Sequence, residues 1–238
     1  MTTTAQAGPL NFRDFDKDGL YLLLDGETRY LLDKGSVLEF AERFLEDPER
    51  VPVEIKKSVD FEKCEVCPKR DEPGYCHAIM PALPLVDLSE RYLSFDKVTV
   101  VARTQLFDQQ EPVFQVAVTS MQNALKYVSV LSLMYYCEVG RKYWKYFSWI
   151  LPLSSVKEIA ARFYLNVYWM NGGDRNEVDR IIREFHDEIR ITSQCQIKRL
   201  KLICKSDSFL NAYVLAQVIS ELLDVVGEDL LERESAEA

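Results

Sequence analysis

The feature of the sequence that most constrains the fold is a group of three cysteines between residues 64 and 77. Cys64, Cys67 and Cys76 lie in this segment, and His77, one of two histidines in the chain, follows directly. Two cysteines separated by two residues can aim both sulfur atoms at one ion, and the Pro-Gly turn after them can bring the third cysteine back. The spacing therefore predicts a metal-binding loop over residues 64–77.

A tetrahedral site needs a fourth ligand, and the sequence offers two candidates. His77 is adjacent to the loop, but it could share an ion with Cys76 only where the backbone bends, because neighbouring side chains diverge by about 100° at a helix start. Cys137 lies at the end of an apolar segment and would join two distant parts of the chain. Both candidates stay open, and the geometry favours Cys137.

Zn²⁺ is the ion that we expect at this loop, because three or four thiolates in a closed shell are typical of structural zinc sites. Four thiolates also suit an iron–sulfur cluster. Two interpretations without a metal remain, namely a reversible dithiol or disulfide at Cys64–Cys67 and free structural cysteines.

The segments around the loop predict an α+β fold. Residues 20–24 and 28–32 flank an Asp-Gly dipeptide and form a predicted hairpin, and residues 98–102 pair with 113–118 in a second one. Alternating apolar residues at 51–55 predict a short strand that leads to the cysteine loop. The two hairpins and the loop therefore belong to the first half of the chain.

Helical periodicity marks the remaining segments, which are 36–45, 78–92, 121–137, 155–170, 178–189 and 208–226. Ser155 and Glu158 form a capping-box pattern at the start of one helix, and Gly227 is expected to end the last. This order predicts an α+β region at 1–118 with the metal loop, and a helical region at 119–238 that packs with it as one unit.

Composition and charge restrict the possible functions. With 238 residues and 47% hydrophobic content, the chain can bury a substantial core. Its net charge of −9 argues against binding to nucleic acid, since affinity for phosphate comes mainly from cationic side chains. The first residues resemble no signal peptide and no segment reaches eighteen apolar residues, so we expect a cytoplasmic protein without a membrane span, in which thiols stay reduced.

Two further motifs have structural interpretations. Residues 141–149 alternate cationic with aromatic side chains, which can stack on bases, but their helical spacing predicts core packing with the cations reaching solvent. Asp14, Asp16 and Asp18 match the front half of a calcium-binding loop. A predicted strand rather than a helix follows them, so we interpret these residues as a solvated acidic turn.

The order Cys-x2-Cys-x8-Cys, a short helix, a Val-rich hairpin and a helix from Thr119 that carries Cys137 near its end forms a pattern across the first two thirds of the chain. In this pattern the chain resembles a family of uncharacterised bacterial proteins over roughly residues 15–170. The stretch Leu-Pro-Leu-Ser-Ser-Val-x-Glu at 151–158 is similar to the family's His-Leu-Pro-Phe-Ala-Ser-Leu-Glu. His77 stands where the family has Pro, and Tyr-Tyr-Cys-Glu at 135–138 where it has Ser-Gly-Cys-Pro. The resemblance implies a fold and a metal loop, without an activity.

These observations lead to two hypotheses about function. The first is a non-enzymatic cytosolic module for interaction or regulation, stabilised by zinc and acting on a protein partner whose identity the sequence does not give. The second is an iron–sulfur or dithiol redox protein or enzyme that uses the same cysteines. Because the sequence has no glycine-rich phosphate loop and no nucleophile elbow, we favour the first. The oligomeric state is not predicted.

Overall fold

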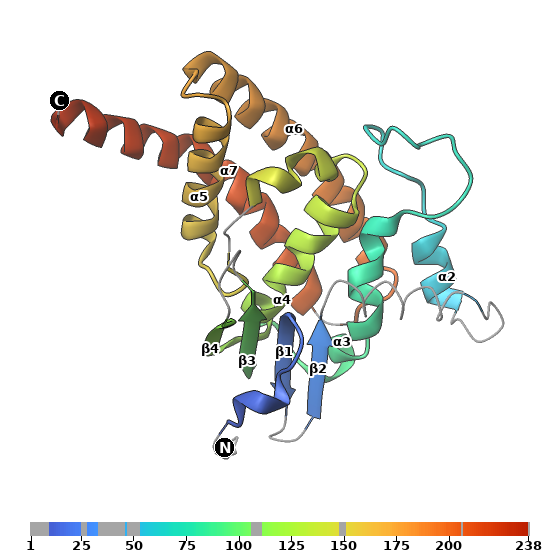
Figure 1. The fold of residues 1–238 in the computed structure, drawn as a ribbon. Coiled ribbons are helices and arrows are strands. Elements are labelled where there is room, and N and C mark those ends of the chain that lie inside the picture. Colours follow the sequence, from blue (N-terminus) through green and yellow to red (C-terminus); the bar gives the residue numbers. More distant parts are fainter. Residues whose placement is uncertain are drawn as a thin grey trace.

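The fold contains a four-stranded antiparallel sheet with the strand order β2-β1-β3-β4, which lies at one side of the molecule (Figure 1). The computed structural model describes residues 10–24, 28–32, 46, 53–105, 111–147, 151–205 and 207–237. The strands are β1 (Gly19–Leu24), β2 (Thr28–Leu32), β3 (Lys97–Thr104) and β4 (Val113–Ser120). Both predicted hairpins are confirmed, since β1 pairs with β2 and β3 with β4, and the pairing of β1 with β3 joins them into one sheet.

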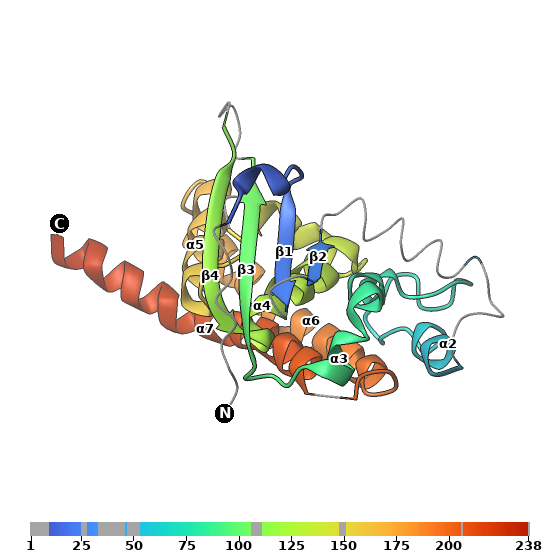
Figure 2. The same cartoon turned by 90° about the horizontal axis from the view of Figure 1, so that it is seen from below.

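The two faces of the sheet bury different residues, as the alternation of side chains along a strand requires. Leu20, Leu22 and Leu24 of β1 face the main core together with Val98 and Val100 of β3. Tyr21 and Val101 point to the opposite face, where Phe15 covers them. Phe15 follows a short 3₁₀-helix, η1 (Phe12–Asp14), which lies across this face in Figure 2.

The helices lie mainly on the other face of the sheet, where α4 to α7 gather in both views (Figures 1 and 2). The α-helices are α2 (Val53–Val59), α3 (Leu88–Arg91), α4 (Met121–Val130), α5 (Val156–Met170), α6 (Arg175–Leu200) and α7 (Ser208–Glu237). Two further 3₁₀-helices and a π-helix connect them, namely η2 (His77–Leu85), η4 (Gly140–Phe147) and η3 (Leu131–Tyr136). The class is therefore α+β, as predicted, with more helix than strand. In the described residues, no helix is both long and apolar enough to cross a membrane.

Helix α5 begins and ends where its sequence predicts. The Ser155 hydroxyl accepts a hydrogen bond from the amide of Glu158 at 3.2 Å, and the Glu158 carboxylate accepts one from the amide of Ser155 at 2.7 Å. This reciprocal capping box satisfies two amides that the first turn leaves free. At the other end Gly172 has φ +64°, a left-handed conformation that stops the helix.

Two sequence predictions are wrong. Residues from Val53 onward form helix α2 instead of a strand, because Ile55, Ser58 and Val59 share one buried helical face. Gly227 does not end α7, which continues to Glu237. A Cβ atom at Gly227 would lie 2.6 Å from the ring of Tyr164, so the glycine allows close packing against α5 instead. The predicted helix at 36–45 and the Asp-Gly turn lie outside the described residues.

The predicted core helix at 121–137 changes its winding halfway. It runs as α4 to Val130 and continues as the π-helix η3, whose end is marked by a hydrogen bond from the amide of Cys137 to the carbonyl of Ser132 at 3.0 Å. Gly140 then packs directly on this turn, because a Cβ atom there would lie 1.7 Å from the carbonyl oxygen of Leu133. The backbone can pass this point only with glycine.

The aromatic segment after Gly140 packs in the core, as predicted for its described part. Tyr143 and Phe147 of η4 are buried, and the ring of Phe147 lies 5.1 Å from that of Phe163. Phe163 in turn lies 4.4 Å from Phe185 of α6. The rings of η4, α5 and α6 thus form one continuous aromatic cluster.

Candidate metal centre

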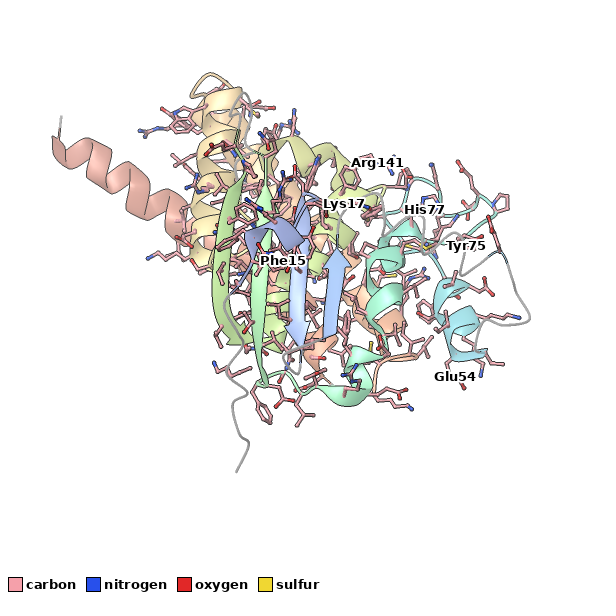
Figure 3. All side chains as sticks on the ribbon, turned by 60° about the horizontal axis from the view of Figure 1, so that its bottom comes forward. Phe15, Lys17, Glu54, Tyr75, His77 and Arg141 are labelled. Carbon is pink, nitrogen blue, oxygen red and sulfur yellow. The ribbon has the colours of Figure 1, made fainter. Side chains whose placement is uncertain are left out.

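The cysteine loop connects α2 to η2 and packs against α6; Figure 3 shows it with Tyr75 and His77 labelled. Its backbone folds in successive turns, with hydrogen bonds from the amide of Cys67 to the carbonyl of Cys64 at 2.9 Å and from Arg70 to Cys67 at 3.1 Å. The ammonium group of Lys63 donates to the carbonyls of Lys69 and Glu72 at 2.9 and 2.7 Å. These bonds join the successive turns of the loop to one another.

The structure brings the four predicted cysteines into one neighbourhood. Cys137, at the end of η3, is buried in a small apolar cluster against which Cys64 and Cys76 pack. Cys67 lies close enough to interact electrostatically with both Cys64 and Cys137. In the part of the chain that the structure describes, no three side chains of His, Cys, Asp or Glu are arranged as a ready-made metal site.

His77 has a different environment from the cysteines. It is the first residue of η2 and is exposed. Its charge acts on Glu138, the residue after Cys137. Burial raises the pKa of Glu138, but the hydrogen bond from Lys69 and the charges of Arg141 and His77 outweigh it, and the net pKa is lowered.

Polar contacts hold the loop beside the end of η3. Lys69 of the loop forms an ion pair with Glu138 at 3.0 Å, and Arg141 approaches the same carboxylate at 3.5 Å. The hydroxyl of Ser132 donates to the carbonyl of Ala78, directly after the loop. The position of Cys137 relative to the loop is therefore fixed from two sides.

Helix α6 contributes three residues that the sequence analysis missed. Gln196, only 1% exposed, donates its amide to the sulfur of Cys76 at 3.3 Å. Cys195 donates to the carbonyl of Glu62 at 3.7 Å and is hydrogen-bonded to Cys64. Arg199 is fully buried and donates to four carbonyls in the segment 58–62.

A signal for these residues is present in the sequence. The apolar stripe of α6 runs from Val178 to Ile189 at helical spacing, and the same stripe continues through Thr192, Gln196 and Arg199. Polar residues that continue a buried stripe in phase point to a buried polar contact rather than to solvent. What the sequence does not give is the partner, which lies more than a hundred positions earlier in the chain.

The environments of the thiols shift their pKa values in different directions. Burial raises the pKa of Cys137 to about 12. The hydrogen bond to Cys195 raises the pKa of Cys64, and the same bond lowers that of Cys195, with support from the charge of Arg199. A buried thiol that is neutral without a metal must lose its proton to bind one, so metal binding here would release protons.

Comparison with known proteins gives a family and no further relative. A family model described as a domain of unknown function (DUF6901) matches residues 28–236. No curated protein and no solved structure matches the chain. The matched range contains the cysteine loop, Cys137 and the residues of α6 that contact them.

Proposed function

The chain belongs to this DUF6901 family, and we propose that it is a non-enzymatic cytosolic module whose fold is stabilised by one zinc ion. Cys64, Cys67, Cys76 and Cys137 would hold the ion. It would join the cysteine loop to the end of the core helix, and the surfaces that it fixes would serve contact with a protein partner in an interaction or regulatory role.

The observation that carries the proposal is the packing of Cys137 with Cys64 and Cys76. Cys64, Cys67 and Cys76 lie close together because they belong to one short loop. Cys137 follows a separate helix, so its position beside them is not a result of sequence proximity. Four sulfur donors form a set that suits zinc. Zinc binding would draw the four sulfurs closer together than they lie in the structure.

The contact between Gln196 and Cys76 also supports a metal role. Metal-bound thiolates accept hydrogen bonds from surrounding groups, and such contacts orient the ligand. The buried amide of Gln196 donates to Cys76 in this way. A helix that lies outside the four ligands would thus position one of them.

The proposed ligand set favours a structural role over a catalytic one. A zinc ion with four thiolates has no open position for water or substrate, whereas catalytic zinc keeps one. An iron–sulfur cluster is the alternative occupant, because four cysteines suit it equally. The two occupants differ in colour and in elemental content.

The experiment is elemental analysis and native mass spectrometry of the purified full chain. We expect about one zinc ion per chain in a colourless protein. Iron with a brown colour would replace the zinc proposal by the iron–sulfur alternative. Protein that carries no metal, even when purified with added zinc under reducing conditions, would refute both.

Variants test the assignment of the ligands. Cys137→Ser should lower the zinc content and reduce the free energy of unfolding by several kcal/mol, because metal affinity contributes to folding (on the order of 10 kcal/mol in small zinc domains). Cys204→Ser, a half-buried thiol outside the cluster, is the matched control and should retain zinc. His77→Ala should also retain it. Zinc kept by Cys137→Ser and lost by His77→Ala would move the fourth ligand to His77.

A further inference from the structure

The fifth cysteine at this site, Cys195, is not needed for a four-thiolate shell. Its sulfur is hydrogen-bonded to Cys64, and it also donates to the carbonyl of Glu62 at 3.7 Å. Cys195 lies on α6, whereas Cys64 lies on the loop, so the contact crosses between two elements far apart in sequence. A bond between the two sulfurs would link the loop covalently to α6.

A cavity gives small molecules access to both sulfurs. Cys64 and Cys195 line a cavity of about 340 Å³ between the loop and α6. Arg70 from the loop and Arg190 and Lys198 from α6 line it as well. Lys63 adds a fourth cation to this lining, and Glu62 and Glu65 add two carboxylates, so the cations outnumber the anions. A molecule the size of water or hydrogen peroxide fits such a space, and the excess positive charge would stabilise an anionic oxygen as it leaves.

We propose that Cys64 and Cys195 form an oxidation site at which a small hydroperoxide generates a disulfide between the loop and α6. The disulfide itself requires only the two thiols and the oxidant. Its effect on the metal rests on the proposed function, because Cys64 is one of the four proposed zinc ligands. Oxidation would remove that ligand and leave three.

The reaction has two steps. The sulfur of Cys195 attacks the terminal oxygen of the hydroperoxide, the O–O bond breaks, and the alcohol (water, when hydrogen peroxide is used) leaves, so that Cys195 carries a sulfenic acid. The sulfur of Cys64 then attacks the sulfur of Cys195, an S–S bond forms, and hydroxide leaves and takes the thiol proton as water. Two thiols together lose two electrons, and one hydroperoxide gains them.

The experiment treats the purified full chain with an equimolar amount of hydrogen peroxide and maps disulfides in unreduced peptides. We expect a mass loss of about 2 Da and a cross-linked pair of peptides that contain Cys64 and Cys195. Cys195→Ser should abolish this pair, and Cys204→Ser, the matched control, should leave it unchanged. A disulfide from Cys64 to Cys67 or Cys76 with Cys195 still reduced would overturn the proposal.

Differential alkylation of the wild-type chain makes the test independent of the folding of the variants. Cys64 and Cys195 should lose their reactivity together as peroxide is added. Zinc release, followed with a chromogenic chelator, should be about tenfold slower in Cys195→Ser. If the cross-link forms in a chain that binds no zinc, only the proposed function fails; if zinc is bound and Cys195 stays reduced, only the oxidation site fails.

Discussion

Replacing the buried Arg199 by methionine should lower the free energy of unfolding by about 3–5 kcal/mol. Arg199 is fully buried in α6, and its guanidinium group donates to the carbonyls of Ser58 and Val59 at 2.9 and 3.2 Å. It also donates to those of Phe61 and Glu62 at 2.6 and 2.7 Å. These carbonyls belong to the end of α2 and the segment that enters the cysteine loop.

The magnitude follows from the number of bonds. Four hydrogen bonds from a charged donor, at about 1.5 kcal/mol each, sum to about 6 kcal/mol. Methionine fills much of the same volume and carries no charge, so the variant avoids the cost of burying a charged group. This gain offsets part of the lost hydrogen-bond energy. The carbonyls at the end of α2 lose their partners, so the net effect remains a loss.

Urea denaturation at neutral pH measures the loss, and the melting temperature should fall by about 6–20 °C in a chain of this size. Arg183→Met is the matched control on the same helix, since Arg183 is exposed and its one side-chain hydrogen bond to the described residues goes to the carbonyl of Asp179 at 3.2 Å. It should change the stability by less than about 0.5 kcal/mol. Equal stabilities of the two variants would show that the four bonds contribute nothing net, and would refute the reasoning.

Two further perturbations test other parts of the fold. Gly140→Ala should cost about 3 kcal/mol, because the new Cβ would meet the backbone of Leu133, whereas Gly172→Ala, which meets nothing within 4 Å, should cost only about 1–2 kcal/mol for its φ of +64°. Thermal melts that rank the two glycines in the opposite order would contradict the proposed close contact. Lys126 is buried and donates to the carbonyl of Ser154, and burial lowers its pKa from 10.5. Between that lowered value and 10.5 the unfolded chain binds more protons, so stability should rise with pH in this window, and Lys126→Met should lack this rise. Parallel pH profiles of unfolding for the two proteins would count against a burial effect on Lys126.

The parts of the fold that sequence predicts are those with local causes. The hairpin of β3 and β4 follows from alternating valines, and the start of α5 follows from the capping box of Ser155 and Glu158. Neither pattern needs a distant partner. The helix α2 was missed because the expected strand rested on a five-residue window. Extension of the window to Ser58 and Val59 gives the helical spacing.

The parts that sequence does not predict depend on distant partners. Arginine is usually exposed to solvent, and the burial of Arg199 is explained by its hydrogen bonds to the carbonyls near Ser58. The three loop cysteines were visible as a motif, but the approach of Cys195 to Cys64 depends on how α6 packs against the loop. Gly227 likewise predicts a helix end from sequence, whereas in the structure it allows α7 to pack closely against the ring of Tyr164.

The direction in which Cys137 points depends on the winding of the π-helix η3 and on the number of residues in it. A π-turn holds one residue more than an α-turn, and one residue of an α-helix corresponds to a rotation of about 100°. If the same number of residues took α-helical winding over 131–136, Cys137 would be rotated by about 100° away from Cys64 and Cys76. A homologous chain that lacks one residue here could take α-helical winding and still present the thiol to the loop, so the spacing between Met121 and Cys137 and the winding of this segment change together.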